Sequence, residues 1–157
     1  MSAKTQGGKA CRTGSVLEAT LPGAFERHNF TVLPYKEYMK LEPPRAGDFL
    51  IRRYPYESIY GHKGHTEFLA RSDTRNLNVR IECKWQQSGG SVDEKFPYLF
   101  QNSLKVPEQE IILLVDGDGY KKCARDWLVQ SAKACTSKII HVFDLKEFLT
   151  WLNNRLG

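Results

Sequence analysis

The stretch from residue 110 to 115 places the strongest constraint on the fold. It contains five consecutive branched apolar residues, Ile111 to Val115, bounded by polar ones. A strand that is apolar at every position has both faces covered, as in a sheet with helices on either side. Downstream, the spacing of apolar residues predicts a helix over 120–134, a strand over 138–143 and a last helix begun by Asp144. Strand, helix, strand and helix in this order imply parallel pairing. We therefore expect an α/β fold, a single domain with a mixed central β-sheet flanked by helices.

Length and composition are those of one domain. The chain has 157 residues, and 41% of them are hydrophobic, which is enough for one core and short for two. No apolar run reaches transmembrane length and the N-terminus is polar through Ser15, so we expect a soluble, cytoplasmic protein of a prokaryote or a phage. We expect residues 1–13 to form a mobile basic tail and residues 14–157 to form the domain. The net charge of +5 favours a polyanionic partner.

Residues 79–86 predict a strand that carries an acid and a base on one face. Apolar and charged residues alternate through this stretch, and the charged face includes Glu82 and Lys84. A second short strand, residues 66–70, carries Glu67 near its start. Turn-forming residues at 71–76 link the two, so we expect an antiparallel hairpin that brings Glu67 near Glu82 and Lys84. The alternative is an ordinary half-buried strand whose charged face is solvated.

Two carboxylates and an ammonium at close range form a site for a hard divalent cation. Mg²⁺ prefers oxygen ligands and keeps several waters, so two carboxylates and a backbone carbonyl suffice to hold it. Such a cation polarises a phosphate and helps to form hydroxide, and a lysine beside it orients water or stabilises the developing charge.

An acid on one strand followed by Glu-x-Lys on the next resembles the PD-(D/E)XK nuclease superfamily, which includes many restriction enzymes and archaeal Holliday-junction resolvases. The run over residues 81–99 is similar to a small phage-type branch of that superfamily. The resemblance implies a restriction-endonuclease-like core, Mg²⁺ as cofactor with Mn²⁺ able to substitute, and DNA as substrate. It also implies that Glu67 and Glu82 are metal carboxylates, that the backbone carbonyl of Cys83 is a third ligand, and that Lys84 is catalytic. In the superfamily the first acid is usually an aspartate after a proline, whereas Glu67 follows Thr66, so Asp73 stays an alternative.

The same resemblance implies three supporting residues. A glutamate on the first helix often lies near the metal, which corresponds to Glu18, although Glu18 also fits a capping box with Ser15. A lysine or glutamine beyond the Glu-x-Lys motif often faces the scissile phosphate, which corresponds to Gln86 and Lys95. The alternative for Gln86 and Lys95 is simple exposure to solvent.

Basic and aromatic residues are interleaved between positions 52 and 65. This mixture suits nucleic acid, because it pairs phosphate contacts with surfaces on which bases or sugars stack. The alternative is an edge strand with a solvated flank. Cleavage of both DNA strands usually needs two sites, so a homodimer is a further expectation. The expected nucleic-acid-binding residues are Arg52, Arg53, Tyr56, His62, Lys63 and His65.

We therefore interpret the sequence as that of a magnesium-dependent endonuclease that hydrolyses DNA phosphodiester bonds. Two rival hypotheses remain. Asp116 and Asp118 follow a strand, as in the Asp-x-Asp magnesium site of Toprim domains, although a turn before a helix explains them equally. Alternatively, the chain is an inactive nucleic-acid-binding module on a nuclease-like fold.

Overall fold

The computed structural model describes the backbone of residues 7–85, 92–117 and 119–157, and the side chains of 16–84, 93–117 and 119–157. In this part of the chain, one mixed sheet has six strands in sequential order. β1 is parallel to β2, β2–β3–β4 are antiparallel, and β4–β5–β6 are parallel. The predicted hairpin and parallel pairings are thus confirmed. The strands are β1 (Thr31–Pro34), β2 (Asp48–Glu57), β3 (Lys63–Ser72), β4 (Leu77–Trp85), β5 (Glu110–Asp116) and β6 (Ile139–Phe143).

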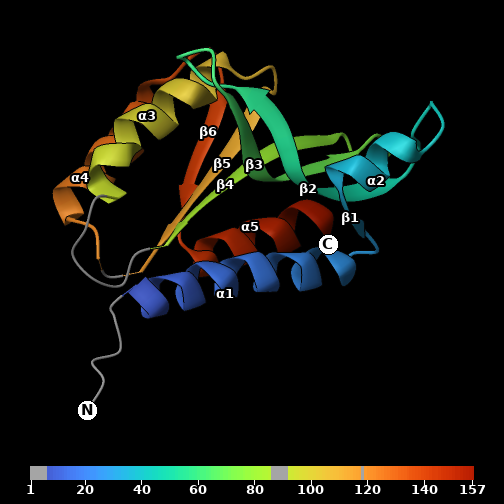
Figure 1. Cartoon of the computed structure of the whole chain (residues 1–157), viewed down its shortest axis with the longest axis horizontal. Helices are drawn as coiled ribbons and strands as arrows, with labels where there is room; N and C mark the ends of the chain where they lie inside the picture. The colour runs from blue at the N-terminus through green and yellow to red at the C-terminus, as the bar shows by residue number, and fades with distance from the viewer. Residues whose placement is uncertain (1–6, 86–91, 118) are drawn as a thin grey trace.

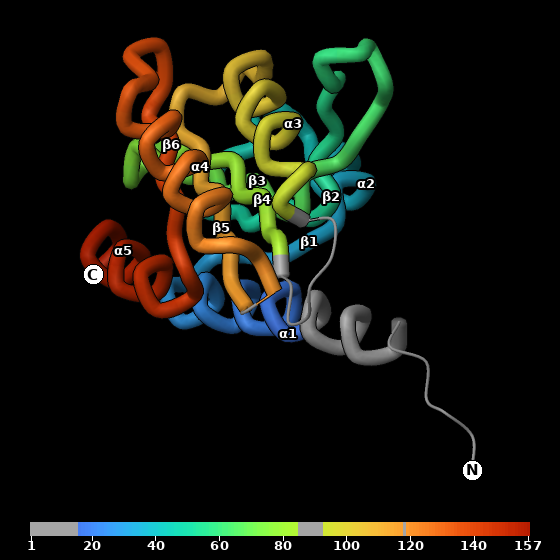
Figure 2. Tube along the Cα trace, turned by 90° about the vertical axis from the view of Figure 1, so that its left-hand side faces the viewer, coloured from blue at the N-terminus to red at the C-terminus, as the bar shows by residue number. Residues whose placement is uncertain are grey.

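Helices cover both faces of the sheet, as the buried run in β5 predicts (Figure 1). α1 and α5 lie side by side on one face, and α3 and α4 lie on the other, as the turned view also shows (Figure 2). The short α2 packs at the β1–β2 end of the sheet. The helices are α1 (Gly7–Glu26), α2 (Tyr35–Lys40), α3 (Val92–Lys105), α4 (Lys122–Ala134) and α5 (Leu145–Leu156).

Each face of the sheet carries its own apolar core. Leu17, Leu21 and Phe25 of α1 pack with Phe148 of α5 against the odd-numbered residues of β4, including Ile81. On the opposite face, apolar residues of α3 and α4 pack on the alternate positions of β5. β5 is therefore buried on both faces, with residues 111–115 fully inaccessible to solvent.

Four features differ from the expectations or were not predicted. α1 begins at Gly7 rather than at Ser15, and residues 1–6 lie outside the described part. α1 also continues through Pro22, since burial of its apolar stripe outweighs a proline penalty of about 3 kcal/mol. β2 is an interior strand between β1 and β3 rather than an edge, and α2 was not predicted.

None of the described helices combines the length and apolar character that a bilayer crossing requires.

Candidate active site

The pairing between β2 and β3 is interrupted at the candidate acid Glu67. The strands pair up to Arg52↔Phe68 and resume at Tyr54↔Thr66, so Arg53 and Glu67 form no pair. Arg53 has φ of 53°, in the left-handed region that non-glycine residues rarely adopt. The β3–β4 ladder likewise runs from Ser72↔Leu77 only to Phe68↔Ile81. The last β3 residue paired with β4 is therefore Phe68, and Glu67 is the first residue beyond the paired part.

Side chains of β3 replace the missing backbone pairs. The Thr66 hydroxyl donates to the carbonyl of Ile81 (2.7 Å), and the amide of Cys83 donates to Glu67 Oε2 (3.1 Å). In an extended strand, the N–H and C=O of one residue point to the same side. The Cys83 carbonyl thus faces the same opening as Glu67. The end of the ladder brings together oxygen atoms from two neighbouring strands.

Glu82 is a buried carboxyl group in this opening, with 8% of its surface exposed. Burial and the nearby Glu67 carboxylate raise the pKa of Glu82 to about 8, while Lys84 acts in the opposite direction. The charge of Glu67 therefore adds to the effect of burial on Glu82. Without a cation, this shift favours the protonated form of Glu82.

Lys84 completes what we call the carboxylate–lysine cluster, which consists of Glu67, Glu82 and Lys84. Its Nζ lies 3.7 Å from Glu67 Oε1, and 28% of its side chain is exposed. Burial lowers the pKa of Lys84, but the carboxylates of Glu67 and Glu82 together raise it further, so the net shift is upward. Lys84 is accordingly a protonated ammonium that is partly open to solvent.

A buried ion pair lies next to the cluster on the same face of β4. Arg80, on the same face of β4 as Glu82 and Lys84, is 2% exposed and bonds Glu108 at 2.8 Å. Its guanidinium lies 5.3 Å from the ring of Tyr56 and 6.0 Å from that of Tyr54. The alternative of a solvated charged face is therefore wrong for Arg80 and Glu82, because aromatic rings of β2 cover this face.

The left-handed Arg53 explains how those rings reach the face. Arg52 lies over Phe68, which belongs to the core against α1. In a regular strand, Arg52, Tyr54 and Tyr56 would all point to that side. Both tyrosines instead contact Arg80 on the opposite side, so the chain reverses its alternation at Arg53.

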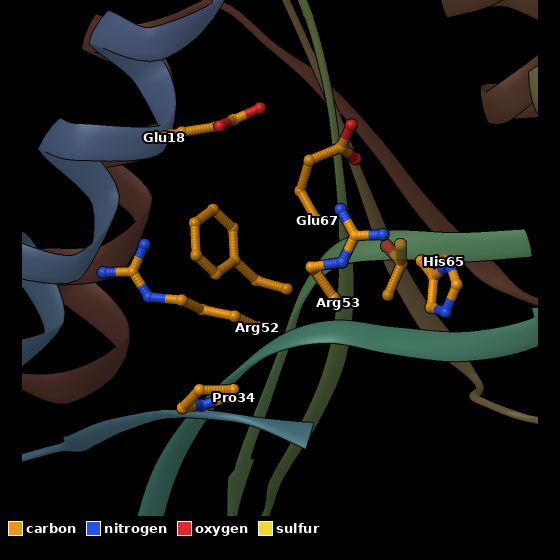
Figure 3. A pocket seen from close by; sticks show the side chains of 8 residues that line it. Glu18, Pro34, Arg52, Arg53, His65 and Glu67 are labelled. Carbon is orange, nitrogen blue, oxygen red and sulfur yellow. The ribbon is translucent and has the colours of Figure 1, made fainter. Parts of the chain in front are cut away.

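A pocket of about 320 Å³ opens beside Glu67. Figure 3 shows the carboxylate of Glu18 projecting from α1 toward the side on which Glu67 lies. Arg52, Arg53 and His65 add basic groups to the wall. Acidic and basic side chains therefore line one concave surface, which suits a phosphate approached by a cation. The remaining lining residues are Pro34, Thr66 and Phe68.

The other predicted residues lie at varying distances from this pocket. His62 and Lys63 are exposed on the β2–β3 connection and the start of β3, and Tyr56 is half-buried beneath the cluster. Lys95 is exposed on α3, and within the described part of the chain it makes no hydrogen bond or ion pair with the cluster. Gln86 lies outside the described residues. Asp73 lies in the β3–β4 turn, six residues from Glu67 along the chain or roughly 20 Å of extended strand.

Asp116 has a clear structural task. Its carboxylate accepts the amides of Gly117 (2.7 Å) and Leu145 (2.9 Å), and so joins the end of β5 to the start of α5. Asp118 lies outside the described residues. The contacts of Asp116 are those of a turn and a helix start, but the helix is α5 and not the following helix α4 that the turn alternative implies.

The oxygen donors of the opening fit a small hard cation. Two carboxylates and one backbone carbonyl match the preference of Mg²⁺, which retains waters at its other positions. Among the described residues, no three His, Cys, Asp or Glu side chains gather in one metal-binding group, so the carbonyl and water would complete the set. A divalent cation would also replace the proton that Glu82 otherwise keeps.

Some contributing residues gave little sequence signal. In the sequence Thr66 is notable only as the residue before Glu67, yet its hydroxyl bonds the backbone of β4. The alternating pattern of the strand places Arg80 on the same face as Glu82 and Lys84. Nothing in the local sequence indicates that its partner is the distant Glu108.

The fold and the site together define an α/β domain with an acid-and-lysine cluster where the sheet divides. A family model described as a PD-(D/E)XK nuclease superfamily domain matches residues 9–156, which is nearly the whole chain. The chain therefore belongs to the PD-(D/E)XK nuclease superfamily. Comparison with curated proteins and with solved structures gives no match.

Proposed function

We propose that this protein is a magnesium-dependent endonuclease that hydrolyses phosphodiester bonds in DNA at the carboxylate–lysine cluster. The observation that carries the proposal is the convergence of Glu67, Glu82 and Lys84 where β3 and β4 separate. A buried carboxyl group beside a second carboxylate is costly for folding alone. A cation that binds both groups gives this arrangement a function.

Glu67 and Glu82 would hold the cation, together with the Cys83 carbonyl. When bound, Mg²⁺ supplies Lewis-acid polarisation of the phosphate and lowers the pKa of a bound water. Lys84 stays protonated beside the carboxylates, so its ammonium is suited to orient water and to stabilise negative charge on the phosphate oxygens. Hydrolysis adds water at phosphorus and breaks one P–O bond.

The pocket wall suits the approach of a DNA backbone. Arg52 and Arg53 are exposed and lie with His65 in the wall that contains Glu67. Basic groups there would contact phosphates that flank the cleaved bond. Glu18, across the pocket, would assist by binding a water of the hydrated cation.

Cleavage of a DNA panel tests this proposal. Linear, nicked, branched and single-stranded DNA would be incubated with Mg²⁺ or Mn²⁺, with wild type beside Lys84→Ala. We expect Lys84→Ala to lower the cleavage rate by roughly 10²–10³-fold while DNA affinity persists. Lys122→Ala is a matched control, because Lys122 is an exposed lysine on α4 whose ammonium bonds Asp126.

Three results would speak against the proposal. Activity that survives full chelation would rule out the metal-dependent mechanism. Equal cleavage by wild type and Lys84→Ala would remove Lys84 from the mechanism. Absence of cleavage by either protein, with tight and salt-sensitive DNA binding, would favour an inactive binding module.

A further inference from the structure

Two tyrosine rings stack at the tip of the β2–β3 hairpin. Tyr60, in the β2–β3 connection, lies against Tyr98 of α3, with ring centroids 5.4 Å apart and planes inclined by 21°. The ring of His62 lies 6.1 Å from Tyr60. Tyr60 is 68% exposed, the largest exposed fraction among the large hydrophobic residues noted at the surface of the described chain. We call Tyr60 and Tyr98 the tyrosine platform.

The hairpin tip is held in place by polar contacts and does not depend on Tyr60. The Ile59 amide donates to Oδ1 of the buried Asn102 (2.9 Å). Lys105 Nζ donates to the Ser58 carbonyl and to Glu57 Oε1, each at 2.7 Å. The Ser58 hydroxyl, which is buried, accepts the amides of Tyr60 and His62. Because these contacts anchor the connection to α3, exposure of the Tyr60 ring is not explained by loop packing.

Basic side chains connect the platform with the candidate active site. Lys63 and His65 are exposed on β3 between the tip and Glu67, and Arg53 is exposed on the neighbouring strand. Glu67 follows Lys63 by four positions along β3, a rise of roughly 13 Å. In a stacked strand of nucleic acid, with a rise of about 3.4 Å per nucleotide, this corresponds to roughly four nucleotides.

We propose that the tyrosine platform stacks on an unpaired base of the DNA substrate, on the side of the cleaved bond toward which β3 leads from Glu67 to the hairpin tip. This inference rests on the proposed function. An unpaired base presents an open aromatic face, whereas bases in a duplex are covered by their neighbours. The inferred substrate class is DNA with a single-stranded segment beside the cleavage site. Basic residues along β3 contact the intervening phosphates.

Fluorescence of 2-aminopurine tests the stacking directly. DNA would carry this base either unpaired beside a duplex or within a fully paired duplex, and binding would be measured with chelator present so that no cleavage intervenes. Wild type should quench the unpaired base. Tyr60→Ala should abolish the quenching and weaken affinity for this DNA by about tenfold, with duplex affinity unchanged. Tyr60→Phe, which keeps the ring, should behave as wild type.

Trp127→Ala is the matched control. Trp127 is another exposed aromatic residue that packs on a ring of α3, that of Phe100, but it lies on α4 rather than at the hairpin. Its loss should leave quenching intact. Thermal unfolding of every variant establishes that it is folded, and Tyr98→Ala provides a second removal of the platform.

The outcomes separate this inference from the proposed function. Equal weakening of both DNAs by Tyr60→Ala, or quenching that persists without the ring, would overturn the platform. Lys84-dependent cleavage without any effect of Tyr60→Ala would leave the nuclease standing and reject the platform. Quenching that depends on Tyr60, with no cleavage by any variant, would support the platform and reject the nuclease.

Discussion

Glu82 is a carboxyl group whose surroundings disfavour its charged form. It lies on β4 near a second carboxyl group, that of Glu67, and only 8% of its surface is exposed to solvent. Its raised pKa expresses this cost, because the charged form is disfavoured by burial and then by Glu67. Lys84 relieves part of the repulsion. A divalent cation would relieve more of it.

The first prediction concerns Glu82→Gln. The amide carries no charge to bury beside Glu67, so the metal-free variant should melt at or above the temperature of wild type. Mg²⁺ should raise the Tm of wild type, since a ligand at 100 times its Kd stabilises by about 2.7 kcal/mol, and this rise should vanish in the variant. Calorimetry with and without Mg²⁺ measures both effects.

The control is Glu37→Gln, which removes an exposed carboxylate of α2 that bonds Lys40. This variant should keep the Mg²⁺-dependent rise in Tm. An equal rise in Glu82→Gln and wild type would remove Glu82 from the cation site.

At the scale of secondary-structure elements, the start of α5 depends on two aspartates. Asp144 forms a capping box with Glu147, and Asp116 binds the amides of Gly117 and Leu145 from the end of β5. Buried amides at a helix start need such acceptors. The Asp116 carboxylate therefore connects the strand with the helix that covers it.

Asp116→Asn should thus lower stability and spare activity. We expect a loss of about 1 kcal/mol in the free energy of unfolding, similar to loss of a helix cap, with cleavage per folded molecule unchanged. Urea unfolding and the cleavage assay measure the two quantities, and Asp144→Asn is a matched cap variant. Abolished cleavage in Asp116→Asn at unchanged stability, with Glu82→Gln still active, would instead favour the Toprim hypothesis.

Another link between elements is sensitive to pH. Glu110 at the start of β5 bonds His141 of β6 (2.9 Å) and lies 3.7 Å from Arg155 of α5. The hydrogen bond from His141 holds the pKa of Glu110 below its ordinary value, against the effect of burial. A lowered folded-state pKa contributes stability above the unfolded value of 4.5, and this contribution is lost as pH falls through the folded value.

Glu110→Gln should therefore be less stable than wild type at neutral pH, and the difference should disappear in acid. Unfolding free energies measured from about pH 7 to pH 3 would show this convergence. A difference that stays constant across the range would mean that the ionised carboxylate is not the source of the stability.

At the scale of the whole molecule, the effect of the net charge of +5 on DNA binding depends on where the basic residues lie. Arg52 and Arg53 are exposed beside Glu67, where the pairing of β2 with β1 ends and β2 passes along the pocket. Replacing both by Ala should weaken DNA binding and make the slope of log K against log salt shallower by about two. The double variant Lys122→Ala/Lys133→Ala, on exposed sites of α4, should keep the slope of wild type. An unchanged slope in the arginine variant would place the DNA elsewhere.

Much of the architecture follows from local sequence. The apolar run in β5 predicts a strand buried on both faces, and Asp144 predicts the start of α5. The alternation in β4 predicts which residues face α1. These features depend on side chains a few residues apart, so a periodic pattern reveals them. Residues 34–65 contain α2 and the whole of β2, and the prolines and glycines of this segment obscured both elements.

The sequence alone determined that Glu82 and Lys84 share one face of a strand and that Glu67 lies on a neighbouring strand. Only the tertiary structure decided that the ladder ends at Phe68↔Ile81, that Arg53 reverses the alternation of β2, and that Arg80 is buried against Glu108. These outcomes depend on register and on contacts between distant segments. A strand pattern carries no record of where pairing stops, and it is the end of pairing that opens the site.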